Sequence, residues 1–309
     1  LDAIARAGIG NLAVNASSLF DAHLPLLEHA RAGVVSALET DYVSPLIGSA
    51  ISAGAFRTPV LFRTHGGRAA DLATGRAHID VAFIAAPAAD PMGNCSGKFG
   101  PSACGSLGYA FADALYADRV VVLTDRLVPY PLAQLSIDET RVDCVVCVDS
   151  IGDPAGIVSG TTRITRDPVG LIIASLAARA IEASGLLTDG MSFQTGAGGA
   201  SLAVARLLMD RMLEKKVRGS FGLGGITGYL VDMLNAGCFS TLLDVQCFDL
   251  AAVESIRVNS NHREISAMQY ASSASKSAAV DSLDVVILGA TEIDTNFNVN
   301  VHTGHDGAI

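Results

Sequence analysis

The sequence predicts an α/β protein built on mainly parallel sheets, and two observations carry this prediction. Short runs rich in β-branched and aromatic residues alternate with amphipathic stretches of helical length along the whole chain. The same order of elements recurs in the second half of the chain, which favours two related domains. With 309 residues the chain is long enough to enclose two apolar cores of ordinary size.

The first half of the chain contains runs typical of strands, separated by stretches suited to crossover helices. The predicted strands are residues 11–17, 34–39, 59–63, 78–86, 119–124 and 143–149. The predicted helices between them are residues 24–32, 44–54 and 68–75. Residues 149–168 are rich in Gly, Pro and Thr and show no periodicity, so we expect the domain boundary there. The expected domains are residues 1–160 and 161–309.

The second half repeats the alternation. Its predicted helices are residues 168–184, 201–215, 225–236 and 249–258. Its predicted strands are residues 191–195, 219–223, 241–247, 282–290 and 296–303. Helices inserted between successive strands are what a parallel sheet requires.

The composition narrows the classes of function. Half of the residues are hydrophobic and 17% are charged, a balance that favours dense burial over disorder. Mean hydropathy is +0.41, but charges such as Arg179 and Glu182 interrupt the apolar stretches, so we expect no membrane span. A formal net charge of −10 argues against binding nucleic acid through its phosphates. An anionic substrate held by backbone N–H groups or by one or two arginines stays open.

The six cysteines lack the spacing of a disulfide framework, so we expect reduced thiols in a cytoplasmic protein. The chain opens with LDAIARAGIG, which has neither the basic start nor the apolar core of a signal peptide. It also begins without Met and stops at Ile309 in Gly-rich sequence, so we expect a piece of a longer protein.

The strongest local signal is the segment FQTGAGGAS, residues 193–201, where a strand runs through glycines into a helix. Gly196, Gly198 and Gly199 allow the backbone to approach a ligand, and Ser201 is the expected N-cap of the helix. The first-turn N–H groups favour a phosphate, a carboxylate or the oxyanion of a thioester. The alternative is a turn whose glycines serve only tight packing.

The segment His65-Gly66-Gly67-Arg68 follows the same logic, because a strand, paired glycines and a helix with a cation at its start succeed one another. We therefore regard it as a second candidate binding site. The alternative is a tight turn with a solvated arginine.

Polar residues also follow two predicted strands at their carboxyl ends. Gln246 ends the apolar strand TLLDVQ, the position where open α/β sheets place groups that contact ligands. Asp294 precedes Asn296, Asn298 and Asn300, which alternate with apolar residues as in a strand and would then share one face. Such a row of amides suits a polyhydroxy or polycarboxylate ligand.

Three other segments favour structural roles. The small residues 103–109 suit close packing or the wall of a substrate site. Cys144 and Cys147 have the spacing of redox or zinc pairs, but they lie within a predicted strand, so we expect buried free thiols. His302 and His305 have no supporting ligand cluster, and we predict no metal site.

Ten segments in unbroken order resemble the citrate lyase alpha subunit family, also called citrate CoA-transferase. In the second half they are FQTGAGGASLAVARLL, GGITGYLVDML, LLDVQCFD, EISAMQYA and DVVILGATEIDTNFNVNVHTG. In the first half they are NASSLFDAHLPLLEH, HGGR, IDVAFIAAP, GSLGYAFADALYADRVVVLT and LVPYP. The resemblance spans essentially the whole chain. It implies a class I CoA-transferase fold of two related α/β domains with the active site between them.

The resemblance also implies a reaction, in which acetyl-carrier and citrate give citryl-carrier and acetate. The implied partners are the acyl carrier (gamma) subunit and a beta subunit that cleaves citryl-carrier, within an oligomeric citrate lyase complex. The carrier supplies a CoA-like phosphoribosyl-dephospho-CoA arm, and no cofactor is expected to be bound covalently by this chain.

The resemblance assigns roles to the candidate residues. Gly196, Gly198 and Gly199 would line the thioester oxyanion or the arm, and residues 294–300 would line the cleft. Related transferases use a Glu nucleophile where this chain has Gln246, and an amide cannot form the acyl anhydride. Citrate's own carboxylate would then attack the acetyl thioester, and Gln246 would orient citrate or the thioester carbonyl. Two alternatives stay open, a CoA-transferase for another acid such as citramalate and a non-catalytic assembly or sensor subunit.

Overall fold

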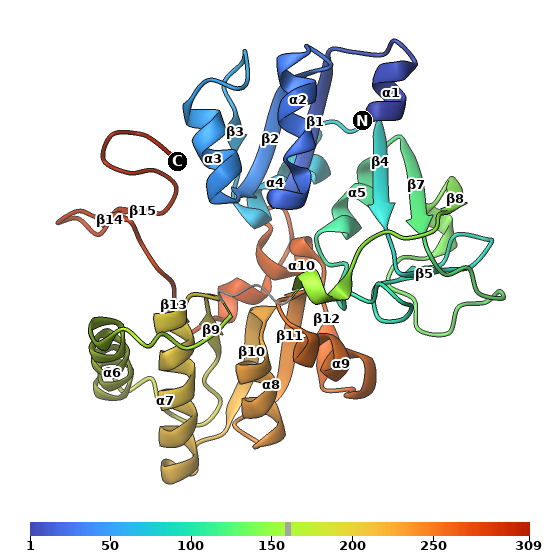
Figure 1. Cartoon of the computed structure of the whole chain (residues 1–309). Coiled ribbons are helices and arrows are strands. Elements are labelled where there is room, and N and C mark those ends of the chain that lie inside the picture. Colours follow the sequence, from blue (N-terminus) through green and yellow to red (C-terminus); the bar gives the residue numbers. More distant parts are fainter. Residues whose placement is uncertain (158–161) are drawn as a thin grey trace. The chain divides into compact units, whose positions relative to one another are not determined.

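The computed structural model describes residues 1–157 and 162–309, which form two compact units (Figure 1). The first unit contains Leu1–Arg68 and Ala290–Ile309, and the second contains Ala69–Gly289. The predicted boundary between residues 160 and 161 lies outside the described residues, so the division into residues 1–160 and 161–309 stays a prediction. The compact units divide the chain after Arg68 and after Gly289 instead.

The first unit is built on a parallel three-stranded sheet in the order β1-β2-β3. Its strands are β1 Leu12–Leu19, β2 Val35–Val43 and β3 Leu61–Phe62, and its helices are α1 Asp2–Arg6, α2 Pro25–Arg31 and α3 Pro45–Ser52, with the short 3₁₀ helix η1 Asp21–His23. Pro25 and Pro45 each stand at the start of a helix, where the missing N–H costs no hydrogen bond. Leu27 and Ile47 from these helices pack with Leu38 of the sheet into one buried cluster.

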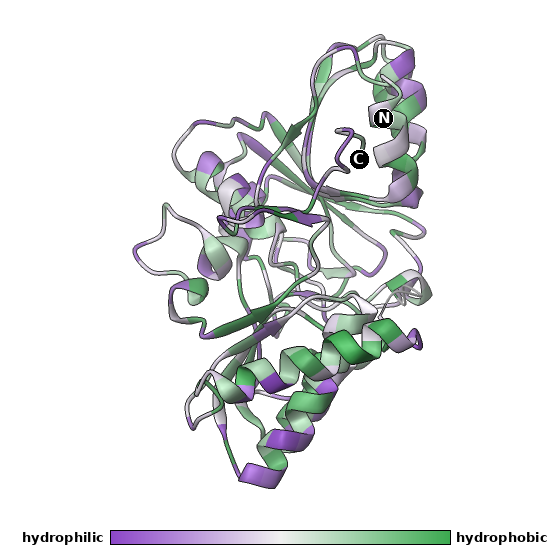
Figure 2. Cartoon of the chain, turned by 90° about the vertical axis from the view of Figure 1, so that its left-hand side faces the viewer, coloured by the Kyte–Doolittle hydropathy of each residue, from purple (hydrophilic) through white to green (hydrophobic). Residues whose placement is uncertain are grey.

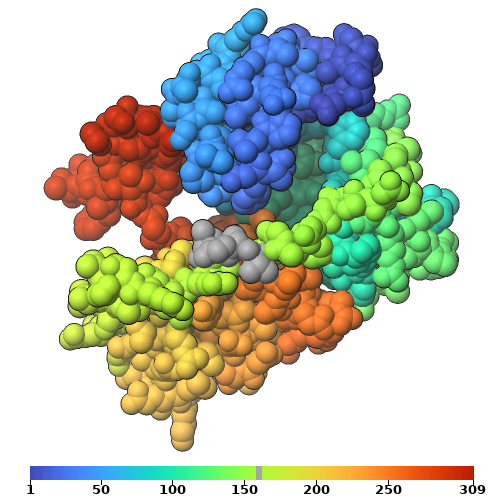
Figure 3. Space-filling model, viewed as in Figure 1, coloured from blue at the N-terminus to red at the C-terminus, as the bar shows by residue number. Residues whose placement is uncertain are grey.

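The last segment of the chain belongs to this same unit. Figure 3 shows residues near the C-terminus, in dark red, against the blue residues of the unit. The Ile309 N–H donates to Ser52 Oγ at 2.9 Å, and Ile309 covers Gly48, where a Cβ would lie 2.8 Å from its side chain. Before this contact, β14 Glu292–Ile293 and β15 Val299–Asn300 form an antiparallel pair.

The second unit is centred on a parallel five-stranded sheet in the order β12-β11-β10-β9-β13. Its strands are β9 Phe193–Thr195, β10 Gly219–Ile226, β11 Phe239–Cys247, β12 His262–Glu264 and β13 Val285–Ile287. The associated helices are α6 Pro168–Ala183, α7 Gly199–Lys215, α8 Gly228–Asn235, α9 Leu250–Val258 and α10 Ala267–Ala271, with η4 Ala279–Ser282. Phe193, Leu208, Leu230 and Leu242 are fully buried members of its core.

A smaller parallel sheet in the order β4-β7-β8 belongs to the same unit. The elements around it are β4 Val81–Ala85, β5 Ala88–Ala89, β6 Cys95–Ser96, α5 Ala110–Tyr116, β7 Arg119–Thr124, β8 Cys144–Cys147, η2 Glu139–Arg141 and η3 Pro154–Ile157. The helix α4 His65–Ala73 begins in the first unit and continues into the second. Asp90, between β5 and β6, accepts backbone hydrogen bonds from Met92, Gly93 and Leu132 and so fixes this turn.

The predicted α/β class with mainly parallel sheets is confirmed, because nearly every strand pair among the described residues is parallel. The predicted strand at residues 296–303 is wrong, since only Val299–Asn300 is extended there. Helix α6 was predicted to within one residue at each end, and its side chains Ile172 and Leu176 are exposed. Figure 2 shows a long, largely hydrophobic helix, in green, near the lower edge of the view. No helix in residues 1–157 or 162–309 is long and apolar enough to cross a membrane.

Candidate functional site

The glycine-rich turn between β9 and α7 lies where the sequence places it, at the carboxyl end of a parallel strand. The strand ends at Thr195 and the helix begins at Gly199, with Gly198 as the N-cap. The expectation that Ser201 is the N-cap is wrong, because Ser201 is the third residue of the helix and its side chain is buried. Gly198 can stand at the cap because its backbone is extended, with φ −68° and ψ 148°, and the cap has no side-chain hydrogen bond.

The three glycines of this turn have different surroundings. A Cβ on Gly199 would lie 2.9 Å from both Arg163 O and Thr165 N, so tight packing explains this glycine. A Cβ on Gly198 would meet nothing within 4 Å among the described residues. The Gly196 N–H donates to Ile287 O at 2.8 Å. The packing interpretation therefore fits Gly199, whereas no described residue fills the space beside Gly198 at the helix N-terminus.

Gln246 lies at the carboxyl end of β11, beside an irregularity in its pairing with β10. Gly224 pairs with Asp244 whereas Gly225 pairs with Gln246, so Val245 is an extra residue and β11 carries a bulge. Gln246 is half-buried, and within the described part of the chain its side-chain amide has no hydrogen-bond partner. The amide is therefore available to a ligand at the sheet edge.

Gln194 is a second amide in this sheet and lies on β9, which pairs with β10 on the side opposite β11. Its Nε2 donates to Tyr270 Oη at 2.7 Å. A Cβ on Gly224 would lie 3.2 Å from Gln194 Cδ, so the two residues pack closely. Gly224 also has a φ of +106°, which suits glycine. Burial raises the pKa of Tyr270, so the phenol stays a neutral hydrogen-bonding group. The signal available in the sequence was a glutamine inside the predicted strand, between Phe193 and Thr195.

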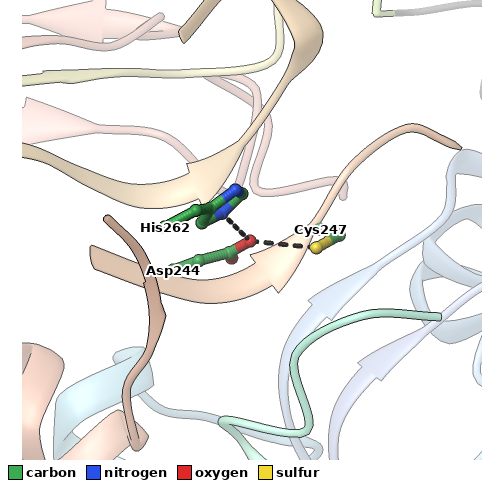
Figure 4. A group of neighbouring side chains, drawn as sticks. All are labelled: Asp244, Cys247 and His262. Atoms are coloured by element: carbon green, nitrogen blue, oxygen red, sulfur yellow. Dashed lines mark hydrogen bonds and ion pairs between the residues drawn. The ribbon is translucent and has the colours of Figure 1, made fainter. Parts of the chain in front are cut away.

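A buried cluster lies directly beneath the bulge and was missed by sequence reasoning. Asp244 Oδ2 lies 2.9 Å from His262 Nε2 and accepts a hydrogen bond from Cys247 Sγ at 2.9 Å (Figure 4). His262 Nδ1 lies 2.9 Å from Ser255 Oγ of α9. Burial raises the pKa of Asp244 and raises the pKa of Cys247 well above its usual value. The sequence LLDVQC shows Asp244 and Cys247 three residues apart, but their side chains lie on the same side only because of the bulge.

The segment His65–Arg68 forms the first turn of α4 in the first unit. The Gly67 N–H donates to Thr64 Oγ1 at 2.9 Å, which caps the helix. Arg68 is only 3% exposed and its Nε donates to Asn15 Oδ1 at 2.6 Å, so the solvated-arginine alternative is wrong. His65 Nδ1 lies 3.2 Å from Asp41 Oδ2.

A network of polar groups on the three strands continues from Arg68, and these residues were not predicted. Asn15 Nδ2 donates to Glu39 Oε2 at 3.0 Å. Arg63 donates to the same oxygen through Nε at 3.1 Å and Nη2 at 3.0 Å. An asparagine and a glutamate inside strand patterns were the signal, since buried polar groups in strands need partners.

The amides of residues 294–300 do not form the predicted row on a strand. Asp294 Oδ1 accepts from the backbone N–H groups of Asn296 and Asn298 at 2.8 and 2.9 Å, and Asn298 Nδ2 donates to Asp294 Oδ2 at 2.8 Å. Asn300 Nδ2 donates to Glu292 Oε2 and Thr303 O. An Asp that bonds the following backbone closes a turn, and this local bonding prevailed over the apolar alternation.

The remaining sequence expectations have mixed outcomes. Among the small residues 103–109, Gly105 packs on Cys247, where a Cβ would lie 2.2 Å from Sγ, which supports the close-packing interpretation. Cys144 and Cys147 are free but exposed on β8, so the expectation of burial is wrong, because β8 ends the small sheet. The His302 ring lies 5.2 Å from that of Phe62.

The candidate residues thus fall into two groups, one in each unit. In the second unit, Gln246 lies near the carboxyl end of β11 and residues 196–201 follow β9, and these two strands flank β10 in one sheet. In the first unit, residues 65–68 join Asn15 and Asp41, and residues 294–300 form a separate turn. Which of these residues bind or react stays a prediction.

The fold places the chain among α/β proteins with mainly parallel sheets. A malonate decarboxylase hetero-tetramer from Pseudomonas shares the fold with a TM-score of 0.70 at 19% identity over 98% of this chain and 55% of that one. The model of the family described as citrate lyase, alpha subunit, matches residues 1–309, and the chain belongs to that family.

Relatives and a solved structure agree with this assignment. The chain is 49% identical to the citrate lyase alpha chain of Escherichia coli and 48% identical to that of Haemophilus influenzae, each over all 309 residues. It covers 61% and 62% of those chains, so it spans about three fifths of their length. The alpha subunit of citrate lyase from Streptococcus mutans, in complex with citrate, superposes with a TM-score of 0.95 at 48% identity, over 100% of this chain and 61% of that one.

Proposed function

We propose that the whole protein is the transferase subunit of citrate lyase, which exchanges acetyl for citryl on the thiol of an acyl carrier. The observation that carries the proposal is the match to the Streptococcus mutans alpha subunit in complex with citrate, at 48% identity over the entire chain. Identity of this extent supports the same substrate, because the polar groups that recognise a tricarboxylate must keep their types and positions.

The proposed exchange needs no redox step and balances within its substrates. A carboxylate oxygen of citrate attacks the acetyl thioester carbonyl, the carrier thiolate leaves, and an acetyl-citrate anhydride forms. The thiolate then attacks the citryl carbonyl of the anhydride, the C–O bond breaks, and acetate leaves. Both steps develop negative charge on a carbonyl oxygen, so donors placed before the reaction lower the barrier.

This chain can supply such donors without a nucleophile of its own. The free amide of Gln246 can hold a citrate carboxylate or the thioester carbonyl, but it cannot form an anhydride. The first-turn N–H groups of α7, beside the open space at Gly198, are suited to a carbonyl oxygen that gains charge. In the first unit, Arg68 and His65 would contribute to substrate or carrier binding.

The proposed partners are the acyl carrier (gamma) subunit with its CoA-like arm, which acts as a substrate, and the beta subunit that cleaves citryl-carrier. Citrate enters and acetate leaves, and this chain holds no covalent cofactor in the proposed cycle. A cytoplasmic location is also proposed, since all six cysteines are free thiols.

The test mixes the full-length protein with acetyl-carrier and labelled citrate or labelled citramalate. We expect the label from citrate to appear on the carrier, with release of an equal amount of acetate. Preferential transfer of citramalate would establish the alternative acid. Transfer of neither label by well-folded protein would refute the transferase proposal and favour an assembly subunit.

A further inference from the structure

The bulge in β11 determines where the Gln246 side chain points. In a regular strand, Asp244 and Gln246 would lie on one face, and Cys247 on the other. Because Val245 is an extra residue opposite β10, the alternation shifts by one position. Asp244 and Cys247 therefore converge on one side, with Sγ and Oδ2 2.9 Å apart, and Gln246 is left half-buried and without a partner in the described part of the chain.

The carboxylate of Asp244 connects the bulge to its surroundings. Its Oδ2 bonds Cys247 across the bulge and His262 on the neighbouring strand β12, and the imidazole continues to Ser255 on α9. The side chains of Asp244 and His262 are both 0% exposed, so water does not compete for these bonds. One chain of hydrogen bonds thus joins β11, β12 and α9.

The backbone around the bulge is held as well. Asp244 O accepts from Ser106 Oγ at 3.0 Å and from the Ile265 N–H at 2.9 Å. Gly105 leaves just enough room for the Cys247 sulfur. The small-residue segment therefore seals the cluster from outside, and a larger residue at Gly105 would displace the sulfur.

We propose that Asp244, Cys247 and His262 form a lock that fixes the β11 bulge and so aims the Gln246 amide at the substrate. They are positioning residues, since each acts through Gln246. The inference rests on the proposed function for its kinetic consequence, but the local rigidity it assigns to β11 does not depend on that function.

A hydrogen-bonded lock fits the geometry better than a metal site does. The three side chains offer ligand atoms of the types that zinc binds. However, the two contacts to Asp244 Oδ2 are 2.9 Å long, the length of hydrogen bonds, and tetrahedral zinc ligands about 2.0–2.3 Å from the ion would stand farther apart. One equivalent of zinc in purified full-length protein would overturn the lock.

The kinetic test uses the full-length protein with Cys247→Ala, Cys247→Ser and the control Cys238→Ala. Cys238 is also a buried free thiol of the second unit and packs in the same apolar core as Cys247, but its thiol has no hydrogen-bond partner among the described residues. We expect Cys247→Ala to lower kcat about tenfold, a typical coupling for residues in one network. Cys247→Ser, which keeps a donor to Asp244, should recover most of the loss, and Cys238→Ala should leave kcat within about twofold.

A double-mutant cycle separates positioning from a general structural role. In the Gln246→Ala background, Cys247→Ala should change kcat by less than about twofold, because the residue that it positions is already gone. An equal tenfold loss in both backgrounds would show that the cluster acts by another route.

Hydrogen exchange measured by mass spectrometry tests the lock independently of activity. Peptides covering residues 243–248 should exchange faster in Cys247→Ala than in the Cys238→Ala control. Unchanged exchange in Cys247→Ala would refute the lock even if the wild-type protein is an active transferase. If the wild-type protein transfers no citryl group but Cys247→Ala still exchanges faster than the control, only the proposed function is refuted.

Discussion

The two units hold their polar candidate residues in different ways. In the first unit, Glu39 and Arg63 are paired charges whose side chains are 30% and 17% exposed. In the second unit, the groups nearest the sheet edge are neutral amides, and the carboxyl group of Asp244 is fully buried. Partly hydrated ion pairs can rearrange around a ligand at low cost, whereas a buried cluster holds one geometry. The buried cluster is therefore the more rigid of the two arrangements.

The largest expected effect concerns the amide of Gln246. Replacing Gln246 by Ala should lower kcat for citryl transfer by roughly 100-fold, the usual loss when one preorganised donor is removed. The KM for citrate should change much less, because the donor acts mainly on the charge that develops in the transition state.

Steady-state kinetics with acetyl-carrier and citrate give both constants. Asn at position 246 is the matched variant, since it keeps the amide but shortens its reach. An alanine variant with unchanged kcat would remove Gln246 from the mechanism, and with it the distinction drawn between the two units.

The second effect concerns Arg68 in the first unit. Arg68→Met keeps most of the apolar length but removes the donor to Asn15, which leaves buried polar groups unsatisfied. We expect a loss of about 2 kcal/mol in the free energy of unfolding and a higher KM for citrate or carrier.

Denaturant unfolding measures the stability, and Arg76→Met is the control. Arg76 also pairs with an acid, Asp71, but its side chain is 66% exposed, so its removal should cost less than about 1 kcal/mol. Equal costs for the two variants would mean that Arg68 is not held as the structure shows.

The third effect separates packing from ligand contact in the glycine-rich turn. Gly199→Ala brings a Cβ within 2.9 Å of backbone atoms and should destabilise the protein by about 1–2 kcal/mol. Gly198→Ala meets open space at an ordinary φ of −68°, so its stability should stay within about 0.5 kcal/mol of the wild type.

If a carbonyl oxygen approaches the helix N-terminus, Gly198→Ala should nevertheless reduce transfer activity. Thermal unfolding and transfer assays on both variants test whether Gly199→Ala mainly loses stability and Gly198→Ala mainly loses activity. Full activity in Gly198→Ala would leave the glycine-rich turn as a packing feature only.

The sequence predicted the fold well and the site only in part, for identifiable physical reasons. Strong alternation and helical periodicity located α6, α7 and β11 within a few residues, because burial follows these periods. The lock beneath Gln246 could not be predicted, since it depends on one extra residue in β11 and on a contact with His262 in a strand of three residues. Residues 294–300 were misassigned because the hydrogen bonds of Asp294 compete with a strand, and alternation alone does not reveal them.

The smallest expected effect is a local pH dependence of the turn at residues 294–300 in the first unit. Hydrogen bonds from the Asn298 side chain and then from the Asn298 backbone lower the pKa of Asp294 below its ordinary value of 3.8; desolvation opposes them, and the Asn296 backbone adds a further lowering. A carboxyl group whose pKa is lower when folded stabilises the turn above the unfolded pKa, and this contribution disappears as the pH falls through the folded pKa.

NMR amide shifts of residues 294–300 should therefore be constant from neutral pH to about pH 5 and change below about pH 4. In Asp294→Asn the change at the Asn296 and Asn298 amides, which bond Asp294, should be lost. A titration of the turn centred above the ordinary pKa of a carboxyl group would contradict the hydrogen bonds assigned to Asp294.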